Sequence, residues 1–116
     1  MKRPVFACAG LLAALALSPA PDASAANITM RGASSCALWV KGRAGKDASY
    51  EKTWLTGYFT GLSIGFDINF WGVPGKDELD NEALWKRVDA YCAQNAGHSL
   101  VQAAEKIFLE RMRAVK

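Results

Sequence analysis

The spacing of apolar residues along the chain predicts four helices. In four segments, which begin near residues 35, 49, 80 and 99, apolar side chains recur every three or four positions. This is the period of one face of an α-helix, whereas a half-buried β-strand alternates apolar and polar residues strictly. No segment shows convincing alternation of that kind. The chain is therefore predicted to be an all-α, compact four-helix domain.

Short polar residues mark where three of these helices begin. Ser34 or Ser35 can cap the first helix, because a serine hydroxyl accepts hydrogen bonds from the free amides of the first turn. Asp80 can cap the third helix, and Ser99 with Gln102 forms a capping box at the fourth. The positions expected to face the core are Cys36, Trp39 and Val40 in the first helix, Leu84, Val88, Tyr91 and Cys92 in the third, and Val101, Ala104, Phe108 and Met112 in the fourth.

The second helix, predicted over residues 49–67, has an unusual composition. It carries no charged residue from 53 to 66, and glycine stands at every fourth position, at Gly57, Gly61 and Gly65. Each glycine costs a helix about 1 kcal/mol relative to alanine, so three on one face need a compensating gain. We expect that gain to be close approach of a neighbouring helix, which makes the glycine row a packing groove within the domain. If the row faces solvent instead, it becomes a candidate partner site.

The same spacing of glycines occurs where transmembrane helices pair. Because this segment is short and belongs to a chain with an export signal, packing within the domain is favoured over that alternative.

Two segments are predicted to be loops. Residues 42–47 connect the first two helices, and residues 70–77 form a turn-rich loop that contains Phe70 and Trp71. These two aromatic side chains either fold back onto the core or stay exposed, and exposed aromatic residues are typical anchors of interfaces. We take Phe70 and Trp71 as the candidate partner surface.

The first 25 residues have the layout of a secretory signal peptide. The basic start Met1-Lys2-Arg3 is followed by an apolar run over 5–17 and by the small residues Ala23-Ser24-Ala25. The apolar run is shorter than the roughly 20 residues that span a bilayer. We expect a signal peptide over residues 1–25 and a helical domain over residues 26–116, exported to the periplasm.

The charge balance argues against nucleic acid and against the membrane surface as partners. The chain has a net charge of +3, which becomes +2 without Lys2, Arg3 and Asp22 of the signal peptide. A charge this small gives little attraction to polyanions. No later segment is long and apolar enough to cross a membrane, so no membrane association is expected after processing.

Two cysteines remain after the signal peptide is removed, Cys36 and Cys92. In an oxidising compartment an even pair in a small domain indicates one disulfide. On the chain-entropy model such a bridge stabilises the fold by roughly 4 kcal/mol. A metal site is the rival, but two cysteines and the single histidine, His98, do not supply four well-spaced ligands. No cofactor is expected.

Candidate catalytic residues are few. His98 lies in the turn between the third and fourth helices and is expected to be a solvent-facing loop residue. Two carboxylates at a suitable separation can serve hydrolysis, and the candidates are Asp67, Asp77, Asp80 and Asp89. Helix capping explains Asp77 and Asp80 without catalysis. The chain is therefore expected not to be an enzyme.

Several motifs occur together in a group of exported bacterial proteins. With Trp54-Leu55-x-Gly57-Tyr58-x-x-Gly61, Asp80-Asn81 and Trp85-x-x-x-Asp89-x-Tyr91-Cys92, the chain resembles the Rap/Tai-type immunity proteins of type VI secretion. The resemblance implies a periplasmic, disulfide-bonded helical protein that binds and neutralises a cell-wall amidase delivered by a competitor. It also implies structural roles for Gly57, Tyr58, Gly61, Tyr91 and Cys92. The overall layout is similar to that of Hde-type periplasmic acid chaperones as well.

These observations favour a non-catalytic exported protein that binds a protein partner. An immunity protein or inhibitor that neutralises a cell-wall-targeting effector is the form that the resemblance implies. The alternative is an acid-stress chaperone, which would expose apolar surface as its carboxylates become protonated. A small hydrolase is a third hypothesis, and a homodimer is compatible with all three.

Overall fold

The computed structural model of the chain describes residues 29–73, 75 and 78–113. These residues form four α-helices: α1 (Cys36–Gly45), α2 (Ser49–Phe66), α3 (Asn81–Gln94) and α4 (Leu100–Arg113). The all-α, four-helix prediction is confirmed. The predicted signal peptide lies outside the described residues, and so does Asp77.

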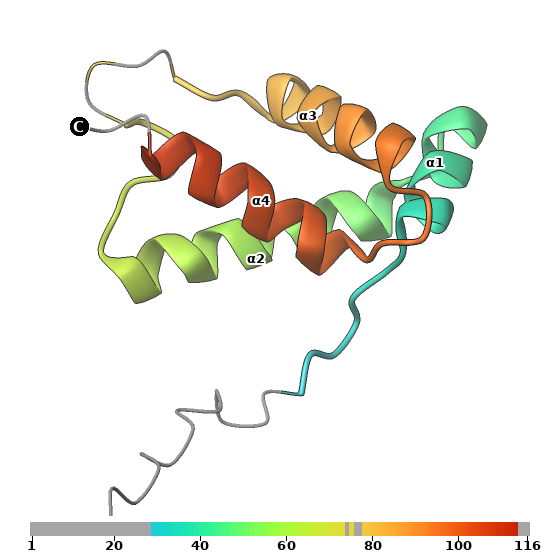
Figure 1. The fold of residues 1–116 in the computed structure, drawn as a ribbon, viewed down its shortest axis with the longest axis horizontal. Coiled ribbons are helices and arrows are strands. Elements are labelled where there is room, and N and C mark those ends of the chain that lie inside the picture. The colour runs from blue at the N-terminus through green and yellow to red at the C-terminus, as the bar shows by residue number, and fades with distance from the viewer. Residues whose placement is uncertain (1–28, 74, 76–77, 114–116) are drawn as a thin grey trace, which may run out of the picture.

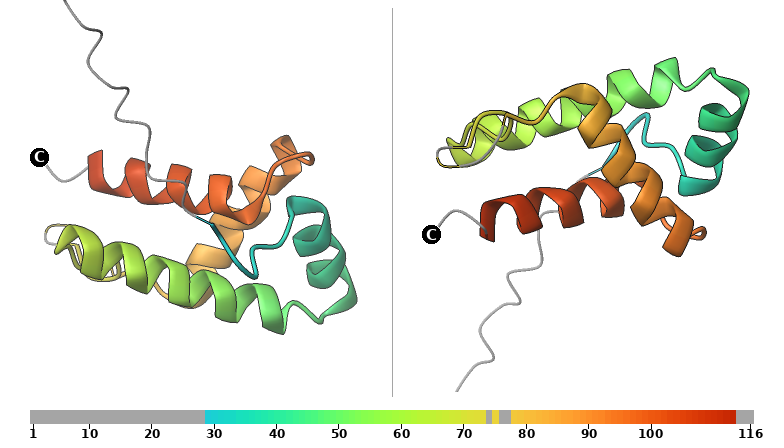
Figure 2. Two further views of the ribbon diagram at one scale, coloured as in Figure 1. Left: turned by 90° about the horizontal axis from the view of Figure 1, so that it is seen from below. Right: turned by 90° about the horizontal axis from the view of Figure 1, so that it is seen from above.

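The helices form two layers with α1 at one end. Figures 1 and 2 show that α2 and α4 run alongside each other, while α3 crosses on one side of them. The fourth helix contacts all three others, and α1 packs against α3 and α4. The outer side of α2 is left without a neighbouring helix.

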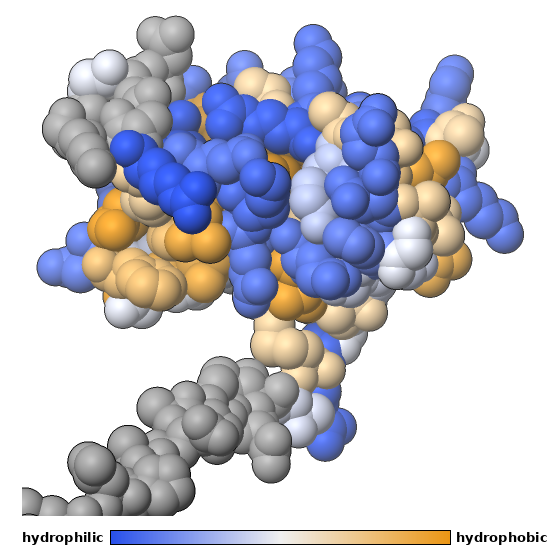
Figure 3. All heavy atoms as spheres, viewed as in Figure 1, coloured by the Kyte–Doolittle hydropathy of each residue, from blue (hydrophilic) through white to orange (hydrophobic). Residues whose placement is uncertain are grey.

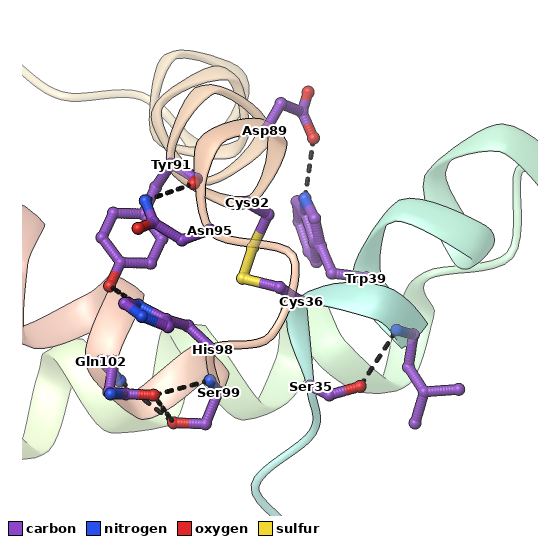
Figure 4. Close-up of a disulfide and its surroundings, with 11 residues drawn as sticks. Ser35, Cys36, Trp39, Asp89, Tyr91, Cys92, Asn95, His98, Ser99 and Gln102 are labelled. Atoms are coloured by element: carbon purple, nitrogen blue, oxygen red, sulfur yellow. Dashed lines mark hydrogen bonds between the residues drawn. A yellow bond between two sulfur atoms is a disulfide. The ribbon is translucent and has the colours of Figure 1, made fainter.

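The capping predictions are confirmed for three helices. The Ser35 hydroxyl accepts from the Leu38 amide at the start of α1, and Asp80 accepts from the Ala83 amide at the start of α3. At α4, the Ser99 amide donates to Oε1 of Gln102 at 2.9 Å, and the Gln102 amide donates back to the Ser99 hydroxyl at 3.3 Å (Figure 4). Such reciprocal bonds satisfy amides that the first turn of a helix leaves free.

The predicted loop over residues 42–47 is shorter in the structure. The first helix continues through most of it and ends at Gly45. Lys46 then adopts a left-handed conformation, with φ at 62°, and its amide donates a hydrogen bond to the carbonyl of Arg43 in the last turn of the helix. The second helix begins without a side-chain cap and ends at Phe66, and its C-cap residue Asp67 is left-handed as well.

The core lies where the inner faces of the helices meet. Trp39, Leu55, Phe59, Leu84 and Leu100 are fully buried there. The prediction that Val40 faces inward is wrong: Val40 is 48% exposed. Trp39 and Cys36 already occupy the contact of α1 with α3, so the short first helix has no second buried face.

One disulfide joins α1 to α3, as predicted. Cys36 and Cys92 are both buried, with their Cα atoms 5.0 Å apart (Figure 4). The amide of Cys36 also donates to the carbonyl of His98, and the amide of Leu100 donates to the carbonyl of Ser34. The start of α1 is thus held both to α3 and to the connection between α3 and α4.

Phe70 does not form an exposed surface, so this part of the candidate partner surface is wrong. Phe70 is fully buried and stacks on Phe59 of α2, with ring centroids 4.5 Å apart. Trp71 is half-buried and packs edge-on against both rings. The two aromatic residues fold back onto the core, which was the other expectation for this loop.

Arg111 fixes this loop from α4. Its guanidinium is buried and donates to the backbone carbonyls of Phe70 and Trp71. It also lies over the Phe70 ring, 5.6 Å from the centroid. In sequence, Arg111 and Arg113 stand in the last turn of this helix, where a cation is favourable in any case. The buried role was detectable, because Arg111 continues the apolar row of Ala104, Ile107 and Phe108.

Candidate partner-binding groove along α2

The glycine row of α2 faces solvent, so the predicted packing groove within the domain is wrong. A methyl group placed at Gly57, Gly61 or Gly65 would meet no neighbouring side chain or element within 4 Å. The helix buries the opposite side, through Leu55 and Phe59. With nothing packed against them, the three glycines bring no gain within the chain that offsets their cost to the helix.

A groove of about 530 Å³ runs along this side of α2. One wall is the segment that precedes α1, and the floor and second wall come from α2 itself. The lining residues are Thr29, Met30, Arg31, Thr53, Trp54, Gly57, Tyr58, Gly61 and Leu62. Its lining is mainly apolar and aromatic, which is typical of pockets that bind other molecules.

Aromatic side chains of α2 hold the first wall in place. Trp54 donates from Nε1 to the carbonyl of Arg31 at 3.1 Å, and the Tyr50 hydroxyl donates to the carbonyl of Gly32 at 2.9 Å. Gly32 has a φ of 75°, which favours glycine. A side chain there would also collide with the Tyr50 hydroxyl. This contact could not be predicted, because residues 29–35 carry no apolar row of helical or strand period.

Tyr58 forms the side of the groove that faces α4. Its ring stacks on Trp54, with centroids 5.0 Å apart, and its hydroxyl donates to Oε1 of Glu105 at 3.2 Å. Burial and the nearby Glu105 carboxylate raise the pKa of Tyr58 to about 12. The hydroxyl is therefore a neutral hydrogen-bond donor at neutral pH. Tyr58 thus packs against the core and also lines the groove.

The end of α2 carries further exposed apolar side chains outside the groove. Ile64 is 77% exposed and Phe66 is 61% exposed. Figure 3 shows hydrophobic residues gathered over this end of α2, whereas hydrophilic residues cover most of α3 and α4 in the same view. Exposed apolar surface of this kind commonly marks an interaction site.

Tyr91 and His98 lie away from the groove and support the disulfide region. The Tyr91 hydroxyl and Nδ1 of His98 are 2.6 Å apart, next to Cys92 (Figure 4). His98 is half-buried, so the expectation of a solvent-facing loop residue is wrong. Together with the Cys36–His98 backbone bond, this pair fixes the turn between α3 and α4.

Asp89, a candidate of the hydrolase hypothesis, is an inter-helix partner in the structure. It accepts from Nε1 of Trp39 at 2.8 Å and from Nη2 of Arg43 at 2.9 Å, both in α1 (Figure 4 shows the bond with Trp39). Burial acts to raise the pKa of Asp89, but the hydrogen bonds from Arg43 and Trp39 outweigh this and lower it. These hydrogen bonds explain why an aspartate stands at position 89 without any catalytic role.

The described residues contain neither a candidate metal centre nor a candidate membrane span. Among them, no group of three or more histidine, cysteine, aspartate or glutamate side chains is placed to hold a metal ion. None of the four helices has the length and apolar character to cross a membrane.

The groove could be predicted from the sequence only in part. The glycine spacing pointed to a surface that another backbone can approach, and the structure shows that this surface is open. Met30 and Arg31 could not be predicted as lining residues of the groove, because only the folded chain brings them next to α2. Comparison with models of known families, with curated proteins and with solved structures gives no significant match.

Proposed function

We propose that this chain is a non-catalytic binding protein that holds a segment of a partner protein in the groove along α2. The single observation that carries the proposal is the solvent-facing glycine row, of which Gly57 and Gly61 form part of the floor of this groove. Three exposed glycines in one helix together cost about 3 kcal/mol relative to alanine. A partner that packs directly on the backbone of α2 would supply the offsetting gain.

The walls of the groove support the same proposal. Trp54 and Tyr58 present a rigid stacked pair, and Leu62 and Met30 add flexible apolar surface. Aromatic residues and methionine are enriched at interfaces because they bury much area with few polar atoms to desolvate. The partner segment that fits is apolar and uncharged, with small side chains where it crosses Gly57 and Gly61.

In its specific form, the proposal is that the chain is an exported inhibitor of a cell-wall hydrolase. This form rests on the resemblance to the Rap/Tai-type immunity proteins, whose Gly-Tyr-x-x-Gly motif corresponds to Gly57, Tyr58 and Gly61. These three residues all line the groove. The motif thus coincides with the surface that the geometry favours for a partner.

A pair of matched variants tests the groove. Gly61→Leu places a side chain on the groove floor, while Gly45→Leu makes the same change at an equally open site in α1. Both variants should fold, since neither glycine has a neighbour within 4 Å. The probe is a purified cell-wall amidase, chosen from any that are encoded near the gene for this chain, and the measurements are calorimetric binding and amidase activity.

We expect the wild-type chain to bind and inhibit the amidase, Gly61→Leu to bind at least tenfold more weakly, and Gly45→Leu to bind as the wild type does. A folded Gly61→Leu variant that binds with unchanged affinity would place the partner elsewhere on the chain. If no amidase encoded nearby binds, the inhibitor form of the proposal is wrong.

Acid-stress chaperoning is the second candidate, and Asp89 is the observation that favours it. Protonation of Asp89 at low pH would remove the ion pair with Arg43 and loosen α1 from α3. The test is suppression of aggregation of a model substrate at about pH 2–3, with the intact disulfide. A chain that stays compact there and leaves aggregation unchanged is not an acid chaperone.

A further inference from the structure

We propose that a second copy of this chain packs on the outer stripe of α2, with the two helices antiparallel and crossing at Gly57. The outer stripe consists of Tyr50, Thr53, Gly57, Thr60 and Ile64. The inference goes beyond the proposed function, because the groove partner is a different protein and the second copy lies over an adjoining face of the helix.

The outer stripe follows the spacing of a helix–helix contact. Its positions are separated alternately by three and four residues, which is the repeat of a seam between paired helices. All five residues are exposed. No other helix of the domain packs on the stripe, since α2 turns Leu55 and Phe59 to the core on its other side. At its start Tyr50 keeps the hydrogen bond to the Gly32 carbonyl.

The charge distribution favours a second copy as the occupant. When two copies meet about a two-fold axis, each charged residue near the axis faces its own like charge. The outward sides of the other long helices carry such charges, including Glu82, Lys86 and Arg87 in α3 and Lys106 and Glu110 in α4. The outer stripe carries none, so two copies of a net-positive chain can approach there without local repulsion.

The side chains of the stripe are also complementary to themselves. Tyr50 and Ile64, its two large members, each lie seven positions from Gly57, on opposite sides of it. An antiparallel crossing at Gly57 therefore sets Tyr50 of one copy against Ile64 of the other, twice. Thr53 meets Thr60 in the same way. Gly57 has no neighbour within 4 Å, which leaves room for the second backbone at the crossing point.

The size of the contact predicts a reversible dimer. At about 1.5 Å per residue the stripe is roughly 20 Å long. A single pair of crossing helices buries less than the roughly 1,200–2,000 Å² of stable complexes, so the dimer should form and dissociate with concentration. Thr53 and Gly57 belong to both the stripe and the groove, so a groove-bound partner would compete with the second copy.

Sedimentation equilibrium of the purified exported chain over a wide concentration range tests the dimer. The wild type should approach twice the mass of one chain as its concentration rises. Ile64→Glu should stay monomeric, because two-fold pairing would bury the new charge against Tyr50. Leu38→Glu is the matched control: Leu38 is another exposed aliphatic residue, 52% exposed on α1, and its replacement should leave the dimer unchanged.

A mixing experiment tests the antiparallel register. Tyr50→Lys and Ile64→Glu should each be monomeric alone, and a mixture of the two should form a heterodimer, because position 50 of one copy faces position 64 of the other. A wild type that is monomeric at all concentrations overturns the proposal. A dimer that survives Ile64→Glu, or a mixture that stays monomeric, overturns it as well, since every variant changes an exposed residue and should fold.

Discussion

Asp89 shows how a single side chain joins two helices in a small domain. Its carboxylate receives hydrogen bonds from Trp39 and Arg43, so it satisfies the indole of a core tryptophan and pairs with a cation of α1. Arg43 in turn lies 5.6 Å from the centre of the Trp39 ring. Removing the charge therefore affects three side chains at once.

We predict that Asp89→Asn lowers the free energy of unfolding at neutral pH by about 1 kcal/mol, a value reduced by the partial exposure of the ion pair. Because folding lowers the pKa of Asp89, its contribution is present above the unfolded-state pKa and is lost as the pH falls through the folded-state pKa. Urea titrations from neutral to acidic pH should show the wild-type and variant stabilities converging. Asp47→Asn, at an exposed position, is the control.

At the level of the helix, α2 differs from the others in what its outer face contains. Two helical glycines provide a direct comparison. A methyl group at Gly42 of α1 would lie 2.9 Å from the carbonyl oxygen of Asp47, whereas one at Gly61 of α2 would meet nothing within 4 Å. Gly42 therefore permits a close approach of the chain to α1, whereas Gly61 permits no such contact within the domain.

We predict that Gly61→Ala stabilises the chain by about 0.5–1 kcal/mol, because alanine restricts the unfolded chain and fits the helix without a clash. Gly42→Ala should destabilise it, since the backbone of Asp47 would have to move. Thermal unfolding of both variants checks the pair. A loss of stability in Gly61→Ala would mean that α2 has a neighbour within the domain after all.

The fourth helix depends on Arg111 for its contact with the loop after α2. We predict that Arg111→Met lowers the free energy of unfolding by about 2–3 kcal/mol, because it leaves the Phe70 and Trp71 carbonyls without this donor. Arg113→Met removes the same charge from an exposed position and should change stability by less than about 0.5 kcal/mol. Equal effects of the two substitutions, measured by chemical denaturation, would contradict the buried role of Arg111.

The helices and the disulfide could be predicted because they follow from local patterns. Asp80 and Ser99 precede apolar rows of helical period, and Cys36 and Cys92 each stand within such a row. The orientation of α2 could not be predicted in the same way. That helix is apolar on several sides, so its sequence does not show which side meets the core. The glycine row suited a buried face and an open one equally well.

On the scale of the whole molecule, the disulfide ties the first helix to the third. We predict that Cys36→Ser combined with Cys92→Ser lowers the free energy of unfolding by about 4 kcal/mol, the value expected for a loop of this length. Calorimetry of the variant and of the oxidised wild type checks this. A difference below about 1 kcal/mol would show that packing of Trp39 and its neighbours alone holds α1 in place.

The position of the disulfide also divides the chain into parts with different freedom to open. Residues from Cys36 to Cys92 form a closed loop that includes α1, α2 and most of α3, whereas α4 follows the loop and has no covalent restraint. Brief local unfolding of the oxidised protein should therefore begin with α4. Its backbone amides should exchange with deuterium sooner than those of α3, and Arg111 is the contact that slows this opening.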